Sequence, residues 1–181
     1  MERRPATPEE AKALANPLRL RILRLCLDEA LTNKQLAERL GRDPGTVLHH
    51  VRSLVATGFL VPDEVRQGEK GALEKPYRST GKSWTLSVGD TAAEPAASQA
   101  MLEAFLAELA EAGPDAAAGF DRLALTLNPA SREELETRVL AILDEFAARP
   151  ADPDGEPYGL FLAIHRRRGQ ASGSGGVAPR S

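Results

Sequence analysis

Polar side chains that can hydrogen-bond to nucleic-acid bases recur with helical spacing between residues 44 and 57. These side chains are Thr46, His49, His50 and Ser53. The opposite side of the same predicted helix is apolar and consists of Val47, Val51, Leu54 and Val55. A solvated helix face without a ligand would more often carry Glu and Lys. The pattern therefore predicts a helix that is buried on one side and contacts base edges with the other, and the alternative is an ordinary helix surface.

A second, shorter helix precedes this one after a tight turn. Thr32 is the expected N-cap of a helix over residues 33–40, and Gly41 ends it in a position that favours a left-handed backbone. Asp43 and Pro44 then begin the polar-faced helix, which Gly58 ends. Such a turn holds two helices near a right angle, so that the second can enter a DNA major groove. At roughly 14 residues, or about 21 Å, the second helix is long enough to lie along one groove segment.

Further elements are predicted on both sides of this helix pair. Thr7-Pro8 and Asn16-Pro17 each combine a cap with a proline, and the second begins a helix that runs to about Glu29. After Gly58 the pattern changes to β-branched and aromatic residues, which predict strands near 59–65 and 77–86. The Gly-rich, charged residues 66–75 between them are the expected tip of a β-hairpin. We therefore expect a mainly helical α+β protein that begins with a winged helix-turn-helix domain at about residues 8–88.

Three segments of this region resemble the winged-helix regulators of the ArsR type. They are residues 13–22, residues 35–40, and the His-Val-Arg-Ser-Leu-Val-Ala-Thr-Gly-Phe-Leu run of residues 50–60. The resemblance covers about residues 8–86, and Leu48 replaces the serine usual two residues before the histidine. It implies a dimeric DNA-binding protein, with basic residues of the wing reaching phosphates or a minor groove. Those wing residues are Arg66, Lys70, Lys75 and Arg78, for which a solvated loop is the alternative.

The remaining predicted DNA contacts lie around the two helices. Thr32, Asn33 and Lys34, at the start of the shorter helix, are expected to hold phosphates, and Arg42 and Arg52 flank the base-reading face.

Metal sensing, which occurs among proteins of the ArsR type, is not expected. The chain has one cysteine and three histidines, and neighbouring residues such as His49 and His50 diverge by about 100° around a helix. Cys26 lies in an apolar run and fits a buried structural cysteine better than a redox sensor. No metal and no cofactor are predicted.

The second half of the chain differs in charge and pattern. Residues 1–90 carry 15 Lys and Arg against 12 Asp and Glu, whereas residues 91–181 carry 8 against 14. An amphipathic helix is predicted over 96–112, with an apolar stripe of Met101, Leu102, Phe105, Leu106 and Leu109. A strand at 120–127, a helix at 131–149 and a strand at 158–166 should follow. Residues 95–168 are the expected dimerisation or effector-sensing region, and the Gly- and Ser-rich residues 169–181 a disordered tail.

Composition limits the classes of function. Aromatic residues make up 4% of the chain, which suits a helical core, and no apolar run approaches the roughly 20 residues of a membrane span. No catalytic motif or apolar leader is present, so a cytoplasmic protein that is not an enzyme is expected. The sequence thus predicts a homodimeric transcription regulator, with a repressor as the expected type, that binds double-stranded DNA and has an unknown small-molecule or protein effector. The alternative is a winged helix used only for protein–protein association.

Overall fold

The computed structural model describes residues 3–68, 71–89, 91–113, 119, 121 and 123–166. It divides into two units, residues 1–149 and residues 150–181. The fold class is the predicted one, mainly helical α+β with an N-terminal winged helix-turn-helix region. The tail at 169–181 lies outside the described residues.

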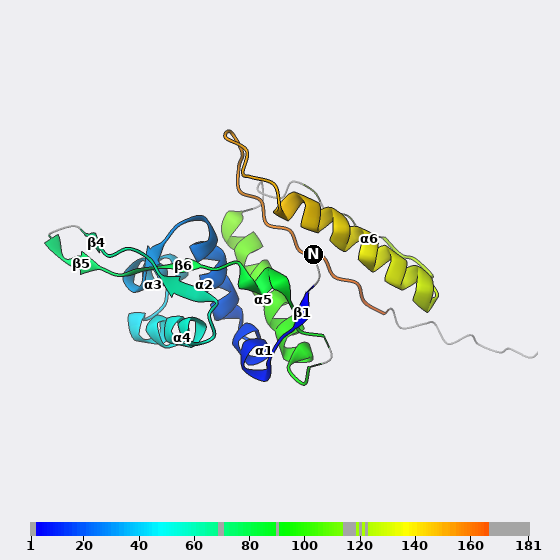
Figure 1. The fold of residues 1–181 in the computed structure, drawn as a ribbon, viewed down its shortest axis with the longest axis horizontal. Helices are drawn as coiled ribbons and strands as arrows, with labels where there is room; N and C mark the ends of the chain where they lie inside the picture. The colour runs from blue at the N-terminus through cyan, green and yellow to red at the C-terminus, as the bar shows by residue number, and fades with distance from the viewer. Residues whose placement is uncertain are drawn as a thin grey trace, which may run out of the picture. The chain divides into compact units, whose positions relative to one another are not determined.

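Four short helices come first and begin where the sequence predicts (Figure 1). They are α1 (Pro8–Leu14), α2 (Pro17–Asp28), α3 (Asn33–Leu40) and α4 (Pro44–Ala56). Each has a side-chain N-cap, respectively Thr7, Asn16, Thr32 and Asp43, that accepts a hydrogen bond from a backbone N–H three residues later. Gly41 ends α3 at φ 58°, the left-handed conformation that favours glycine. The predicted helix boundaries in this part of the chain are therefore confirmed to within about a turn.

A small sheet and a hairpin tip form the wing. The sheet has the order β2–β6–β3, built from β2 (Leu31–Thr32), β3 (Leu60–Pro62) and β6 (Pro76–Ser79). Its strands are antiparallel, with Leu31 opposite Tyr77 and Leu60 opposite Ser79. The tip pairs β4 (Arg66–Gln67) with β5 (Leu73–Glu74). In Figure 1 this hairpin extends away from the helices.

The predicted strand at 77–86 is confirmed at its start, where β6 runs to Ser79, and is wrong over Lys82–Thr85. Lys82–Thr85 form a 3-10 turn, because Gly81 at φ 70° redirects the chain and its carbonyl accepts from Trp84 N at 3.1 Å. After this turn β7 (Leu86–Ser87) is extended, and it leaves the wing to pair in parallel with β1 (Arg4–Pro5).

Glu10 fixes this N-terminal pairing to the domain. The carboxylate is buried and accepts two hydrogen bonds from Arg4, at 2.7 and 2.8 Å. It also accepts from Thr7 N at 2.9 Å and lies 2.7 Å from Lys82 Nζ. Lys82 Nζ donates in turn to Thr57 O, at the end of α4. The hydrogen bond from Arg4 is the main reason why the pKa of Glu10 lies well below its usual range, with Lys82 and the Thr7 amide adding to it.

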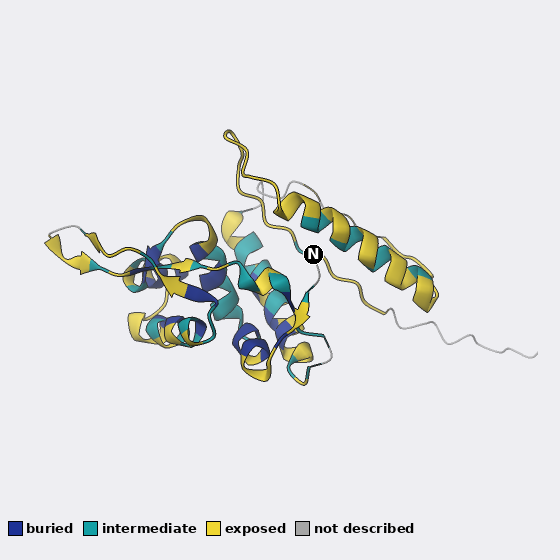
Figure 2. Cartoon of the chain, viewed as in Figure 1, coloured by how far each residue is buried: buried dark blue, intermediate teal, exposed yellow. Residues whose placement is uncertain are grey.

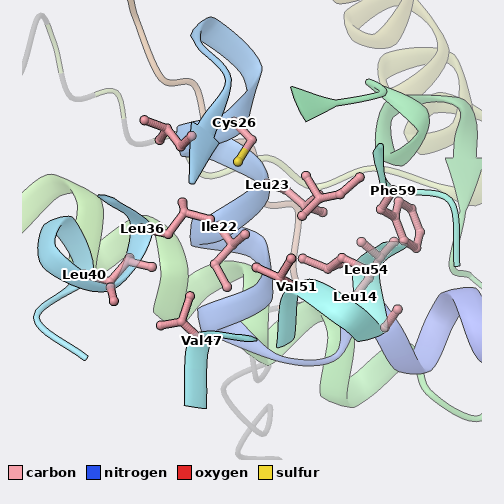
Figure 3. Close-up of a cluster of buried hydrophobic side chains, with 14 of the residues drawn as sticks. Leu14, Ile22, Leu23, Cys26, Leu36, Leu40, Val47, Val51, Leu54 and Phe59 are labelled. Carbon is pink, nitrogen blue, oxygen red and sulfur yellow. The ribbon is translucent and has the colours of Figure 1, made fainter. Parts of the chain in front are cut away.

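The hydrophobic core lies between α1, α2, α3, α4 and β3. Figure 3 shows side chains of the four helices meeting there, among them Ile22, Leu36, Val51 and Leu54, together with Phe59, which directly precedes β3. Cys26 belongs to the same cluster, and burial raises the pKa of its thiol to about 11. The thiol is thus a small apolar core group and stays protonated at neutral pH.

Helix α5 (Glu94–Ala112) packs against α1 and α2 through small residues. Its buried side chains are Ala97, Ala100 and Ala104. The predicted helix is present, and two leucines of its predicted apolar stripe, Leu102 and Leu106, are 38% and 53% exposed. Alanines allow two helix backbones to approach closely, and the larger side chains then fall on the outside of the contact.

Beyond α5 the structure departs most from expectation. Helix α6 (Pro129–Ala147) forms as predicted, but it buries none of its side chains. Neither predicted strand is present among the described residues of 120–127 and 158–166. A strand requires a neighbour to satisfy its backbone N–H and C=O groups, and these two segments have no paired neighbour in the described part of the chain.

Candidate nucleic-acid interface

The buried side of α4 fixes the orientation of its polar side. Val47, Val51 and Leu54 are fully buried in the core. Of the predicted base-reading residues, Thr46 and His49 are exposed, whereas His50 and Ser53 are half-buried. Arg52 is exposed, and so is Arg42 in the turn before α4. The structure thus places this polar and basic face on the surface, as a row of side chains along one helix.

Asn33 connects the two helices of the motif at their N-terminal ends. Its Nδ2 donates to Pro44 O at 2.9 Å, which ties the first residue of α3 to the first residue of α4. Asp43 caps α4 by accepting from Thr46 N at 2.9 Å, and the Thr46 hydroxyl lies 3.4 Å from the same carboxylate oxygen. The Asn33 bond thus joins the two helices, and the Asp43 cap fixes where α4 begins.

Thr32 and Lys34 lie in very different surroundings. Thr32 is buried, and its hydroxyl accepts from Gln35 N at 3.2 Å while Gln35 Oε1 accepts from Thr32 N. Its side chain is therefore occupied in a capping box. The Lys34 side chain is 82% exposed, and its amine is 3.9 Å from Glu38. Lys34 is the more available of the two for a phosphate.

The basic residues of the wing are partly neutralised by acids. Arg66 contacts Glu74 at 3.3 Å and donates to Gln35 Oε1 at 3.1 Å, which connects the wing to α3. Arg78 donates to Asp63 at 2.9 Å.

Arg78 also lines a shallow hollow whose four carboxylates belong to Asp28, Glu29, Asp63 and Glu64. Of the other two predicted wing contacts, Lys75 is exposed and Lys70 lies outside the described residues.

Sequence reasoning missed Arg19, which lies beside the polar face of α4. Arg19 is on α2, and its Nη1 donates to Ser53 Oγ at 3.2 Å. The two residues are 34 positions apart, and no local pattern links them. The pKa of the neighbouring His50 is below its usual value, first because the ring is partly buried and then because of the charges on Arg19 and His49.

Within the described ranges, no three His, Cys, Asp or Glu side chains come together in a way that could hold a metal ion. No helix among these residues is long and apolar enough to cross a membrane.

Comparison with known proteins gives one family and several structures. Residues 14–62 match the model of a family described as a helix-turn-helix domain. No curated protein matches the chain significantly. Among solved structures, reduced HlyU from Vibrio cholerae is 22% identical, covers 52% of this chain and 81% of its own, and has a TM-score of 0.34.

Two structures of a ZitR mutant from Lactococcus lactis are similar at a comparable level. One is 19% identical with a TM-score of 0.32, and it covers 71% of this chain and 73% of its own. The other, the same mutant in its apo form, is 17% identical with a TM-score of 0.34, and it covers 73% of this chain and 83% of its own. The family match includes all of α2, α3 and α4, and it ends at residue 62, before the hairpin of the wing.

Proposed function

We propose that this protein is a sequence-specific DNA-binding transcription regulator, and that α4 is its recognition helix. The observation that carries the proposal is the orientation of α4, whose buried valines leave Thr46, His49 and Arg52 on the surface within a helix-turn-helix match. The exposed groups are hydrogen-bonding and cationic, as base edges and phosphates require.

The proposed contacts divide into two kinds. Thr46, His49, His50 and Ser53 contact base edges in the major groove. Phosphates are held by Asn33, Lys34, Arg42 and Arg52, with Arg66, Lys70 and Lys75 of the wing beside them. Thr32 contributes through its backbone and its cap, since its hydroxyl is already bonded. Arg78 has a smaller part, because Asp63 compensates its charge.

The finer features are proposed from the resemblance of residues 8–86 to ArsR-type regulators. On that basis the protein is a homodimeric repressor. The single cysteine and the divergence of His49 and His50 around α4 support a regulator that does not sense metals, and the proposed DNA-binding role supports a location in the cytoplasm. Residues 8–88 are then the DNA-binding domain and residues 95–168 the dimerisation or effector-sensing region. Support for the last assignment comes from exposed apolar side chains such as Leu102, Leu106 and Phe146, which a second copy or a ligand would cover.

Selection of fragments of the source genome with the purified protein tests this proposal directly. We expect a small set of enriched fragments whose binding weakens steeply with added salt. The variant His49→Ala/Arg52→Ala should lose most of the affinity for DNA. The slope of log affinity against log salt concentration should become shallower by about one unit. Arg138→Ala, which removes an exposed arginine of α6, is the matched control and should bind as the wild type does.

The proposal is wrong if no fragment is enriched over random sequence at moderate salt. That outcome would favour a winged helix that associates only with proteins.

A further inference from the structure

Arg19 reaches from α2 to the polar side of α4 and is held there. It is the third residue of α2, and its backbone N–H donates to the Asn16 cap at 3.1 Å. Its guanidinium is half-buried and donates to Ser53 Oγ at 3.2 Å. Burial lowers the pKa of Arg19 from its ordinary value, but a guanidinium keeps its charge in proteins. A fixed positive charge therefore lies against the recognition helix.

Two buried nitrogen atoms in this cluster have no hydrogen-bond partner among the described residues. They are Nε of Arg19 and Nδ1 of His50. His50 and Ser53 are three residues apart on α4 and so share a side of the helix. The guanidinium Nε–H can only donate, whereas a neutral imidazole has one nitrogen that accepts. The two unpartnered atoms are thus complementary in type, since one is a donor and the other can be an acceptor.

The surroundings of His50 determine which of its nitrogens carries the proton. A proton on Nδ1 would be a buried N–H without an acceptor, and the charge of Arg19 also acts against added positive charge on the ring, so an unprotonated Nδ1 is favoured. The charged groups that act on the ring are Arg19 from α2 and His49 from α4 itself, and both lower the pKa of His50, as does burial. The ring is therefore neutral at physiological pH, and its single proton is on Nε2, at the far edge of the ring.

We propose that Arg19 is a positioning residue for DNA recognition, which presents His50 as a hydrogen-bond donor to guanine. Guanine presents two adjacent acceptors, N7 and O6, in the major groove, whereas adenine N7 lies beside an amino donor and thymine O4 beside a methyl group, so guanine is the best match for an Nε2–H donor. The opposite choice, a His50 that accepts from the amino group of adenine or cytosine, needs an unprotonated Nε2. That tautomer would put the proton on Nδ1, beside the guanidinium. The inference rests on the proposed function only for its DNA part, because the tautomer exists without DNA.

The first test measures the tautomer in the full chain without DNA. In ¹⁵N NMR spectra of the histidine side chains, His50 of the wild type should show a protonated Nε2 and an unprotonated Nδ1. Arg19→Gln should raise the pKa of His50 toward its ordinary 6.5 and mix the two tautomers. Lys12→Gln, which removes an exposed charge of α1, is the control and should change neither. A wild-type His50 protonated at Nδ1 would overturn the proposal, and this measurement requires no variant to fold.

The second test compares the DNA sequences that each variant selects. Arg19→Gln and His50→Ala should both lose about tenfold of the preference for guanine at the same position of the site, and keep the preferences elsewhere. The double variant should lose no more than His50→Ala alone, because the two residues act as one unit. If DNA is bound and Arg19→Gln leaves every preference unchanged, the inference fails while the proposed function stands. If the wild type selects no DNA, the proposed function fails, and the tautomer measurement still decides the role of Arg19.

Discussion

Leucines of the helix-turn-helix region and leucines of residues 123–166 differ in how far they are buried. Leu36, in α3, is fully buried, whereas Leu160, in the second unit, is 74% exposed. Figure 2 shows the contrast, with buried residues in the helices around the core and only exposed or intermediate ones along α6 and the segment after it. No described residue from 123 to 166 is buried. An apolar period therefore predicts which face of an element can be buried, but burial requires a second surface that fits it.

Substituting a leucine in each region should give the largest difference. We expect Leu36→Ala to lower the free energy of unfolding by about 2–5 kcal/mol, because it removes a fully buried side chain and leaves a cavity. Leu160→Ala should change it by less than about 0.5 kcal/mol in dilute protein. Urea denaturation followed by circular dichroism measures both.

The comparison would fail if Leu160→Ala were as destabilising as Leu36→Ala. If Leu160→Ala lost stability only at high protein concentration, that result would sharpen the comparison. It would show that a second copy of the chain covers Leu160.

Carboxylates offer a second contrast between the regions. Glu10 is buried and bonded to Arg4 and Lys82, whereas Glu134 of α6 is exposed in an i,i+4 pair with Arg138. Glu10→Gln should cost on the order of 1–3 kcal/mol at pH 7, and Glu134→Gln less than about 0.5 kcal/mol.

The pH dependence has a defined sign. The folded-state pKa of Glu10 is below its unfolded value of 4.5, so the unfolded chain binds more protons at acid pH. Its stabilisation is complete above about pH 4.5 and is lost progressively as the pH falls below that. Thermal unfolding between about pH 3 and 7 should show a smaller acid loss in Glu10→Gln than in the wild type, and equal losses would contradict the assignment.

Removing the second unit should have the smallest effect. A chain that ends at Arg149 keeps every element of the first unit, so its unfolding free energy should stay within about 0.5 kcal/mol of the full chain. Calorimetry of both proteins at one concentration measures this. A large loss of stability would mean that residues 150–166 cover part of the core region.

The sequence predicted the helices well because their signals are local. Thr7, Asn16, Thr32 and Asp43 each cap a backbone group three residues away, a distance that the chain fixes before any tertiary contact forms. The polar face of the recognition helix followed from the same kind of periodicity, together with the valines on its other side.

The strand predictions failed for the opposite reason. Apolar residues at 123–127 and 158–164 alternate with the period of a strand. A strand forms only when it pairs with another strand, and the alternation does not identify which one. The N-terminal strand was missed because its neighbour is β7, far along the chain, and Leu86–Ser87 carry no pattern that points to Arg4–Pro5.

The sequence by itself therefore determined where the helices of this protein begin and end, and which side of α4 is polar. The tertiary structure decided which residues of that polar side are exposed and which side chain from another helix contacts it. It divided the predicted contacts into exposed Thr46 and His49 and half-buried His50 and Ser53, and it bonded Arg19 to Ser53, where its charge also acts on His50. Caps and periods are properties of neighbouring residues, whereas the position of a charge beside a helix depends on which elements pack together, and only the folded core fixes that.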